Sequence, residues 1–307
     1  MLPIKEYINH PEILGMVILK RYFTWLPDKL YLQQMFKFRM GYKLNLNNPK
    51  TFNEKLQWLK LYNRKPEFSK MVDKYTVKDY VASVIGEEFV IPAIGVWELP
   101  EDIEWGILPN QFVLKTTHGG GSGGVVICKD KTTFDQKEAI SKLKNSMKQD
   151  IWHQLKEWPY KNVKPRIIAE RYLTDDTTSV NGDLNDYKFY CFNGEVKYCE
   201  VITGRYSKKQ IDFFDLEWNH QEFTFNGYEF ADERPAKPNC FDTMVEVAGK
   251  LCKDKPYSRI DLYVVGNKVF FGEITFFPAS GFRGFHPEEW NVRLGDMITL
   301  PPKNNFK

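Results

Sequence analysis

Residues 112–128 read FVLKTTHGGGSGGVVIC, in which two short apolar runs flank a loop of five glycines and one serine. The apolar runs predict two strands of a small antiparallel unit. The bare backbone N–H groups of the loop can approach phosphate oxygens. The loop opens no helix and lacks G-K-[ST], so it fits neither the Walker nor the Rossmann pattern. It therefore indicates a phosphate-covering loop between strands; the alternative is a hairpin loop without a ligand.

A second pair of strands carries the candidate metal ligands. Residues 258–275 contain the runs SRIDLY and FFGEIT, in which charged residues interrupt strongly apolar strands. Alternation puts Arg259 and Asp261 on one face of the first strand, and Glu273 and Thr275 on one face of the second. Carboxylates and a hydroxyl are hard oxygen ligands that suit Mg²⁺, which keeps other positions for water and phosphate. The alternative is a pair of solvent-facing acids with an arginine partner, which the apolar surroundings disfavour.

The turn between these two strands affects the proposed metal site. Gly266-Asn267 is typical of a two-residue hairpin turn, which would pair Asp261 with Gly272. Asp261 and Glu273 would then lie on opposite faces of the sheet. Both can bind one metal only if a three-residue loop or a β-bulge shifts the register. We therefore predict such a distortion.

A third candidate lies at the start of another hairpin, DYKFY at residues 186–190. Asp186, Lys188 and Tyr190 share one face of this strand. Lys188 can contact phosphate as a point charge or form a structural ion pair with Asp186, and both interpretations stay open. The five histidines show no metal-ligand spacing, and no G-x-S-x-G nucleophile elbow or Cys/His pairing stands out. His118 begins the glycine loop, where we expect a capping or packing role.

The remaining pattern predicts an α+β fold. The first 80 residues predict helices, one of which starts at Thr51 with the capping box T-F-N-E. Short apolar runs then predict strands, the first at 89–91, and residues 133–158 predict helices. The last third predicts two hairpins, the first with its turn at Asn193-Gly194, and a helix over 241–252 between them. We expect three parts, namely a helical, basic N-terminal segment at 1–84, a lid subdomain with the glycine-rich loop at 85–170 and a C-terminal subdomain with the magnesium site at 171–307.

Charge is distributed unevenly along the chain. The net charge is +3, but residues 1–80 carry 15 Lys/Arg and 7 Asp/Glu, so this part has a charge of +8 and the remainder −5. Residues 1–80, called the basic front below, form either a solvated helical surface or a docking surface for an acidic polymer or an anionic membrane face. The apolar run at 13–19 is shorter than the roughly 20 residues of a membrane span and lacks a signal-peptide cleavage site. The five cysteines form no C-x-x-C pair, so we expect reduced thiols in a cytoplasmic protein.

In their order along the chain, these features resemble the ATP-grasp superfamily. Residues 72–74, Val-Asp-Lys, are similar to its first ATP-binding lysine segment. Residues 112–124 are similar to its second lysine strand and phosphate-covering glycine loop. Residues 168–173, IAERYL, are similar to the hinge strand that holds adenine. The resemblance implies that Glu170 accepts a hydrogen bond from the adenine amino group and that the backbone near Tyr172 reads the ring edge.

The same resemblance implies roles for the charged strand residues. Arg259 occupies the place of the catalytic arginine, with Lys188 as a second catalytic candidate. Asp261 and Glu273 occupy the places of two magnesium carboxylates, and Thr275 stands where many such ligases carry an asparagine ligand. The implied ATP-binding set is Lys74, Lys115, His118, Gly119, Gly120, Gly121, Ser122, Gly123, Glu170, Tyr172, Leu173 and Asp186, with Asp176 as the alternative to Asp186 for the ribose.

A narrower resemblance, which covers nearly the whole chain, is to the TupA-like ATP-grasp proteins of bacterial polysaccharide gene clusters. It is carried by TFNEK at 51–55, by DYK at 186–188 with CFNG at 191–194, and by GEITF at 272–276. It implies an ATP- and Mg²⁺-dependent carboxylate–amine ligase in the synthesis of teichuronopeptide, capsule or other cell-surface polysaccharide. The carboxylate of a uronic acid or amino acid would form an acylphosphate, which an amine would convert to an amide.

Other functions stay open on the sequence alone. A nucleotide-sugar glycosyltransferase would place a metal on Asp261 and Glu273, although no D-x-D sequence occurs. A sugar kinase-like phosphotransferase would use the same ATP site without an amine, and a non-catalytic glycan-binding module would not need Lys115. The expected partners are a small molecule or glycan with a carboxylate and an amine donor, without nucleic acid. Contact with a membrane-linked glycan at the inner face of the membrane would suit the basic front.

Overall fold

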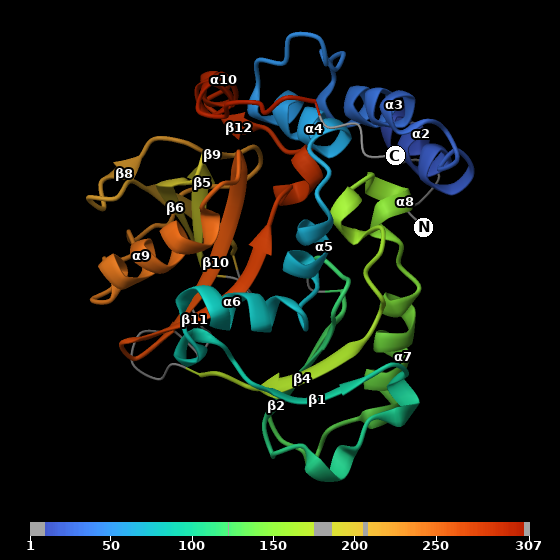
Figure 1. Cartoon of the computed structure of the whole chain (residues 1–307), viewed down its shortest axis with the longest axis vertical. Coiled ribbons are helices and arrows are strands. Elements are labelled where there is room, and N and C mark those ends of the chain that lie inside the picture. Colours follow the sequence, from blue (N-terminus) through green and yellow to red (C-terminus); the bar gives the residue numbers. More distant parts are fainter. Residues whose placement is uncertain (1–9, 122, 175–185, 205–207, 304–307) are drawn as a thin grey trace.

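The computed structural model describes residues 10–121, 123–174, 186–204 and 208–303. Three groups of elements follow one another along the chain: N-terminal helices, a four-stranded sheet and a six-stranded sheet, as Figure 1 shows. Helices and antiparallel sheets are mixed, which confirms the predicted α+β class. Within the described residues, no helix is long and apolar enough to cross a membrane.

In the part of the chain that the structure describes, five helices form the N-terminal group. They are α2 (Pro11–Tyr22), α3 (Asp28–Met40), α4 (Phe52–Tyr62), α5 (Pro66–Val72) and α6 (Val77–Ile85). The predicted capping box is confirmed, because the Glu54 backbone N–H donates to Thr51 Oγ1 at 3.2 Å and the Thr51 N–H donates to Glu54 Oε2 at 3.1 Å. These bonds satisfy backbone donors that a helix start leaves unpaired.

The four-stranded sheet, called the lid sheet below, is antiparallel throughout with the order β1-β4-β2-β3. Its strands are β1 (Ala93–Trp97), β2 (Phe112–Thr116), β3 (Val125–Cys128) and β4 (Ile167–Arg171). Helix α7 (Gln136–Met147) packs on β2 and β3, and the short α8 (Ile151–Leu155) follows. The expected strand at 89–91 is wrong. A 3₁₀ turn occupies Glu87–Phe89, and the first strand begins after Pro92, which lacks the N–H that a strand would use.

The six-stranded sheet has the order β11-β10-β5-β6-β7-β8. Its strands are β5 (Asp186–Phe192), β6 (Glu195–Thr203), β7 (Gln210–Phe214), β8 (His220–Gln221), β10 (Tyr257–Val265) and β11 (Lys268–Thr275). Helix α9 (Phe241–Cys252) packs on this sheet, and a small ribbon pairs β9 (Thr224–Phe225) with β12 (Phe285–His286) ahead of α10 (Glu289–Asp296). Both predicted two-residue turns are confirmed, since Phe192 pairs with Glu195 and Val265 with Lys268.

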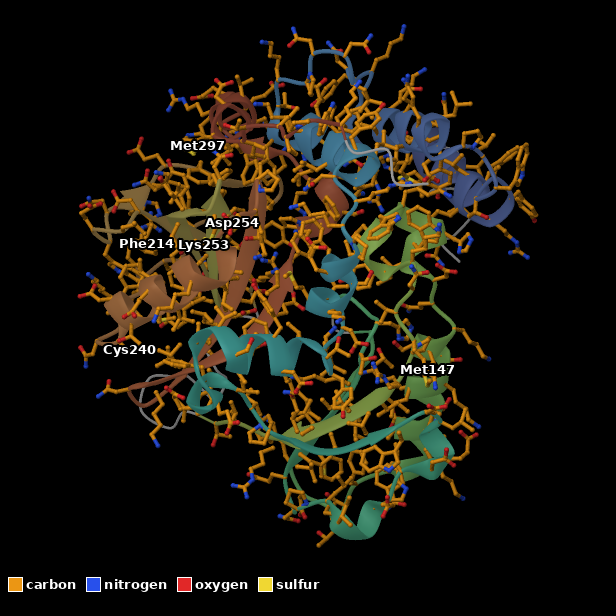
Figure 2. All side chains as sticks on the ribbon, viewed as in Figure 1. Met147, Phe214, Cys240, Lys253, Asp254 and Met297 are labelled. Carbon is orange, nitrogen blue, oxygen red and sulfur yellow. The ribbon has the colours of Figure 1, made fainter. Side chains whose placement is uncertain are left out.

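One large apolar core joins the N-terminal helices to the six-stranded sheet, and a second, smaller core lies under the lid sheet. Figure 2 shows side chains filling the space between the six-stranded sheet and the N-terminal helices above it. Phe52 on α4 packs against the rings of Tyr257 and Phe285, with centroids 5.0 and 5.5 Å apart. Aromatic burial of this kind contributes on the order of 2–3 kcal/mol per side chain. The helices and the six-stranded sheet are therefore held together as one packed unit.

Candidate functional site

The register of β10 and β11 brings the predicted carboxylates together. Leu262 pairs with Phe271, but Asp261 pairs with Glu273, so Gly272 forms a β-bulge. The predicted distortion is confirmed, and it places Asp261 and Glu273 on one face of the sheet. A Cβ at Gly272 would lie 2.9 Å from the backbone oxygen of Asp261, so the bulge needs a residue without a side chain.

Arg259 ties these acids into one network. Its Nε and Nη2 donate to the two oxygens of Asp261 at 2.6 and 2.7 Å. The same Nη2 also reaches Glu273 Oε1 and Thr275 Oγ1, both at 3.2 Å, and the Thr275 hydroxyl donates to Glu273 Oε1 at 3.0 Å. The structure thus assembles the predicted catalytic arginine and all three predicted metal ligands.

The two carboxyls of this network differ in pKa. Burial raises the pKa of Asp261 to about 6, against the attraction of Arg259 and Lys188. Burial also opposes ionisation of Glu273, but Lys74, Arg259 and Lys188 outweigh it and lower its pKa to about 2. Both carboxyls are therefore ionised at neutral pH.

Lys188 lies between two acids on the neighbouring strand β5. Its Nζ is 2.7 Å from Asp186 Oδ2 and 2.6 Å from Asp261 Oδ2. Burial lowers the pKa of Lys188, but the two carboxylates outweigh it and the pKa is raised. Lys188 also pairs in register with Glu200, which accepts a hydrogen bond from Tyr190 at 2.7 Å. Sequence reasoning missed Glu200, because a bulge between β5 and β6 changes its register.

A second charged cluster lies on the lid sheet. Lys115 Nζ donates to Glu170 Oε2 at 2.6 Å, and Lys78 on α6 donates to Glu170 Oε1. Burial opposes ionisation of Glu170, but the two lysines outweigh it and lower the pKa. Each carboxylate oxygen of Glu170 keeps a further lone pair that can accept a hydrogen bond from an adenine amino group. That contact stays a prediction. Sequence reasoning missed Lys78, which lies in the first turn of α6 and reaches Glu170 on another element.

The segment that carries Lys74 is fixed between the two clusters. The Lys74 backbone N–H donates to Thr117 O at 3.1 Å, and Arg166 Nη2 bonds Asp73 Oδ2 at 2.7 Å. The Lys74 ammonium donates to the backbone oxygen of Gly119 in the glycine loop. Burial lowers its pKa, and the next largest influence is Glu273, which raises it. Lys74 therefore connects the lid sheet electrostatically with the carboxylates of the six-stranded sheet.

The glycine loop closes on itself at its base. Thr116 N–H donates to Gly124 O at 2.9 Å, and a Cβ at Gly124 would lie 2.1 Å from Thr116 Oγ1, so glycine is required there. A Cβ at Gly120 or Gly121 would meet nothing within 4 Å, which leaves their backbone open to a ligand. Ser122, also predicted to bind ATP, lies outside the described residues.

Three further residues predicted to bind ATP follow the ends of β2 and β4 along the chain. His118 is buried at the start of the loop, and burial, followed by the charge of Lys74, lowers its pKa, so the ring is neutral. Tyr172 and Leu173 follow β4, and Lys129 Nζ lies 5.8 Å from the centroid of the Tyr172 ring. Asp176, the other candidate for the ribose, lies outside the described residues.

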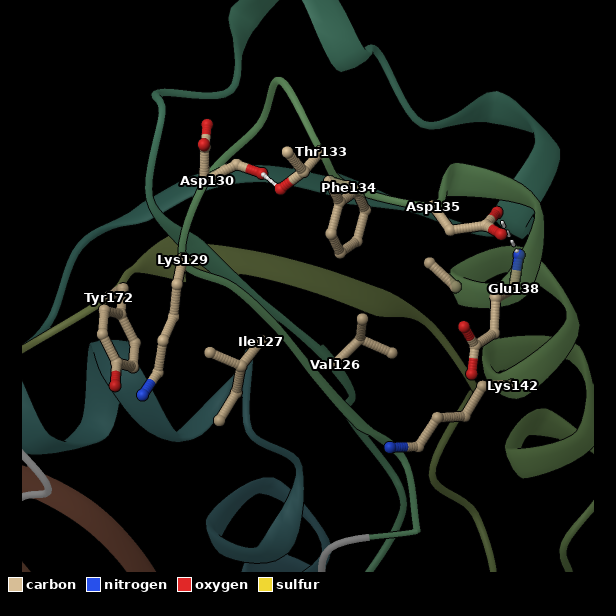
Figure 3. A pocket seen from close by; sticks show the side chains of 11 residues that line it. Val126, Ile127, Lys129, Asp130, Thr133, Phe134, Asp135, Glu138, Lys142 and Tyr172 are labelled. Atoms are coloured by element: carbon tan, nitrogen blue, oxygen red, sulfur yellow. Dashed lines mark hydrogen bonds between the residues drawn. The ribbon is translucent and has the colours of Figure 1, made fainter.

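Tyr172 also lines a separate pocket of about 780 Å³ between the edge strand β3 and α7 (Figure 3). Val126, Ile127 and Phe134 form its apolar part, and Lys142 lies at its rim. The arginine, the carboxylates and the phosphate-binding lysines predicted above do not line this pocket. The site is therefore defined by its charges and not by the size of this pocket.

Helix α4 holds the turn at residues 278–281, which follows β11, the strand that carries Glu273 and Thr275. Asn53, Gln57 and Lys60 lie at positions i, i+4 and i+7 and are fully buried. Gln57 Nε2 donates to Ser280 O at 3.1 Å and to Gly281 O at 3.0 Å, while Lys60 Nζ donates to Ser280 O at 2.8 Å and Oγ at 2.7 Å. Ser280 has φ +55°, a left-handed conformation that costs energy and persists only when neighbours fix it. A polar stripe on an otherwise apolar helix face was the signal for this role.

The residues present fit a magnesium–nucleotide complex. Lys188 and Arg259 contact Asp261, and the charges of Lys74 and Lys115 also interact with Glu273. Four cations near two carboxylates suit a triphosphate. Two carboxylates and a hydroxyl are hard oxygen ligands that would hold Mg²⁺. Mg²⁺ on these ligands would keep its other positions for water and phosphate. No group of three or more His, Cys, Asp or Glu side chains suited to a metal occurs in the described residues.

A glycine-loop sheet and a carboxylate-bearing sheet, connected through the charge of Lys74, define a protein of the ATP-grasp class. The chain belongs to the TupA-like ATP-grasp family, whose family model matches residues 54–299. This match confirms the resemblance expected from the sequence.

Solved structures of ATP-grasp ligases are similar to the chain. The D-alanine–D-alanine ligase of Bacillus anthracis complexed with ATP is 17% identical, with a TM-score of 0.42, over 74% of this chain and 63% of that chain. The D-alanine–D-alanine ligase of Helicobacter pylori is 14% identical, with a TM-score of 0.40, over 75% and 61%. The ATP-grasp ligase PsnB, complexed with a minimal precursor, Mg and ADP, is 13% identical, with a TM-score of 0.36, over 73% and 57%. The chain thus spans less than two thirds of the length of these ligases. No curated protein matches it.

Proposed function

We propose that the chain is an ATP-dependent carboxylate–amine ligase that forms a carbon–nitrogen bond in cell-surface polysaccharide biosynthesis. The observation that carries the proposal is the convergence of Lys74, Lys188 and Arg259 on the paired carboxylates Asp261 and Glu273. Positive groups fixed around the position of a triphosphate stabilise the charge that develops during phosphoryl transfer. Membership of the TupA-like family supports the polysaccharide setting.

The proposed reaction has two steps. A substrate carboxylate oxygen attacks the γ-phosphorus of ATP, the bond to the bridging oxygen breaks, and ADP leaves with an acylphosphate remaining. An amine then attacks the acyl carbon, loses a proton, and expels inorganic phosphate to give the amide. Mg²⁺ held by Asp261, Glu273 and Thr275 would neutralise phosphate charge when bound.

The chain's own residues have distinct roles in this proposal. Lys74 and Lys115 bind phosphate oxygens, and the open backbone of Gly120 and Gly121 covers them against water. Arg259, held by two hydrogen bonds to Asp261, stabilises the charge on the transferring group. Preorganisation of this kind avoids the cost of reorienting charges during the reaction.

The carboxylate substrate is a uronic acid residue or an amino acid, and the amine belongs to the second partner. The excess of positive charge over residues 1–80 supports an anionic glycan as one of the two. A glycosyltransferase reaction remains the outcome to test against, because the same carboxylates could hold a metal on a nucleotide-sugar diphosphate.

The first experiment measures the shift in melting temperature with Mg-ATP, Mg-UDP and Mg-UDP-sugars. Ligand at about 100 times its Kd adds roughly 2.7 kcal/mol of stability, which gives a shift of a few degrees. We expect stabilisation by Mg-ATP that is lost in Asp261→Asn/Glu273→Gln. The control Asp242→Asn/Glu246→Gln changes two exposed carboxylates on α9 and should respond as wild type. Stabilisation by a UDP-sugar and not by ATP would refute the ligase proposal.

The second experiment identifies the reaction class by its products. ADP release that requires both a uronic acid or amino acid and an amine supports ligation. ADP release with a phosphorylated sugar and no amine requirement would instead identify a phosphotransferase. Arg259→Lys is the matched active-site variant, because it keeps the charge but loses the paired hydrogen bonds to Asp261.

A further inference from the structure

Exposed apolar side chains are concentrated at one place on the surface. Of thirteen large hydrophobic side chains exposed in the described part of the chain, seven lie between residues 14 and 30. Trp25 is 73% exposed and Tyr22 is 61% exposed. Concentrated exposed apolar residues mark interaction sites, whereas single ones need no explanation. These seven residues, called the α2 face below, are Leu14, Val17, Ile18, Tyr22, Phe23, Trp25 and Leu30.

The helix geometry makes the α2 face continuous. Leu14, Val17, Ile18 and Tyr22 follow the spacing i, i+3, i+4 and i+8, which places them on one side of α2. A surface helix of a globular protein turns such a stripe toward the core. Here Leu19, on the side of α2 away from the stripe, is buried in the core, and a Cβ at Gly15 would meet the ring of Phe38 on α3 at 2.7 Å. The orientation of α2 is therefore fixed, with its apolar stripe toward solvent.

Positive charges predominate in the segment that carries the α2 face. Residues 11–43 contain six Lys or Arg and only two acids, Glu12 and Asp28. Asp28 is already paired with Arg64 at 2.6 Å, and Glu12 with His10 at 3.1 Å. Burial lowers the pKa of Lys20, and repulsion by Arg39 lowers it further. The charge that acts on Lys20 is therefore another cation. The excess positive charge complements an anionic surface.

The apolar stripe and the positive charge together favour one kind of binding partner. An anionic polymer would use the cations and could stack on the aromatic rings, but it would leave the aliphatic side chains of the α2 face exposed to water. A second copy of the chain, paired face to face, would bring like charges together, because a twofold interface uses the same patch on both subunits. An anionic lipid bilayer accepts both, since aromatic and aliphatic side chains enter the headgroup boundary while Lys and Arg bind the lipid charges.

We propose that the α2 face docks the protein peripherally on an anionic lipid bilayer. The apolar stripe and Trp25 enter the interface, and Arg21 and Lys29, whose side chains are exposed, bind lipid headgroups. Figure 1 shows α2 and α3 at the end of the molecule opposite the lid sheet, so docking leaves the glycine loop uncovered. The proposal does not depend on the proposed ligase activity.

The test is co-sedimentation of the full chain with vesicles of phosphatidylcholine alone or with about one third phosphatidylglycerol. We expect binding to the anionic vesicles that weakens with salt, and much weaker binding to the neutral ones. Arg21→Gln/Lys29→Gln should weaken binding by roughly 30-fold, because each cation near an anionic surface contributes about a fivefold factor. Ile18→Ser/Trp25→Ser should weaken it by on the order of tenfold or more.

The matched control is Leu99→Ser/Ile107→Ser, which removes two apolar side chains, 55% and 51% exposed, outside the α2 face. It should bind vesicles as wild type does. Lipids brominated near the headgroup should quench wild-type fluorescence, and Trp25→Phe should lose this quenching while it still sediments. Absence of binding to anionic vesicles, or an equal loss in the control, overturns the proposal. Concentration-dependent dimerisation that Ile18→Ser/Trp25→Ser abolishes, without lipid binding, would assign the face to a second copy.

Discussion

Replacement of Gly272 by alanine tests the bulge that brings Asp261 and Glu273 together. The added Cβ would lie 2.9 Å from the backbone oxygen of Asp261 and 3.0 Å from Cε2 of Tyr263. The first contact is with backbone, so it can be relieved only by moving a strand. Gly272 has no positive φ, so the substitution acts through this contact and not through backbone strain.

The expected cost is about 1–3 kcal/mol, the usual range for added atoms in a packed region. For a chain of this size each kcal/mol lowers Tm by roughly 2–4 °C. A second effect follows if the strand relieves the clash by removing the bulge. Glu273 would then turn to the opposite face, away from Asp261, and the paired carboxylates would be lost.

Two measurements separate these effects. Thermal unfolding reports the loss of stability, and calorimetric titration with Mg-ATP well below Tm reports the site in folded protein. The control is Gly106→Ala, where a Cβ meets nothing within 4 Å and φ is not positive. We expect Gly272→Ala to lose stability and Mg-ATP affinity, and Gly106→Ala to keep both. If Gly272→Ala matches the control in both measurements, the bulge does not depend on glycine and the reasoning fails.

Three further predictions follow from particular side chains. The pKa of Glu273, about 2 in the folded protein, is below its ordinary value. The ionised carboxylate therefore contributes its full stabilisation above about pH 4.5, and this contribution is lost as the pH falls toward 2. Urea midpoints measured across this range should fall less steeply in Glu273→Gln than in wild type. Lys78→Met removes a partner of buried Glu170 and should cost about 1–3 kcal/mol by urea titration. Lys164→Met breaks an exposed pair and should leave the urea midpoint close to that of wild type. Thr51→Ala removes the cap of α4 and should cost about 0.5–2 kcal/mol, seen as a lower Tm.

Local sequence signals predicted the parts of the fold that local physics determines. The capping box at Thr51, the turns at Asn193-Gly194 and Gly266-Asn267 and the helix over 241–252 depend on neighbouring residues, and all are confirmed. The strand at 89–91 was wrong because an apolar run alone does not distinguish a strand from a partly exposed turn. The short strands β8, β9 and β12 were missed, since two residues are too few for periodicity.

The site was predictable where chemistry constrained geometry. The bulge at Gly272 followed from requiring Asp261 and Glu273 on one face, and it is confirmed. The bulge between β5 and β6, which pairs Lys188 with Glu200, had no such requirement and was not predicted. Lys78 reaches Glu170 from another element, and that contact depends on tertiary packing that no local pattern encodes.

The charge balance of the site argues that metal and nucleotide enter together. Five cations and five acids occupy the two clusters; they are Lys74, Lys78, Lys115, Lys188 and Arg259, with Glu170, Asp186, Glu200, Asp261 and Glu273. A triphosphate alone would add negative charge to a balanced, largely buried site, which is costly in a low-dielectric environment. A divalent cation placed by the carboxylates removes much of that excess. The proposed binding of Mg-ATP therefore needs both the lysines and the carboxylates, and we expect a variant of either cluster to weaken it.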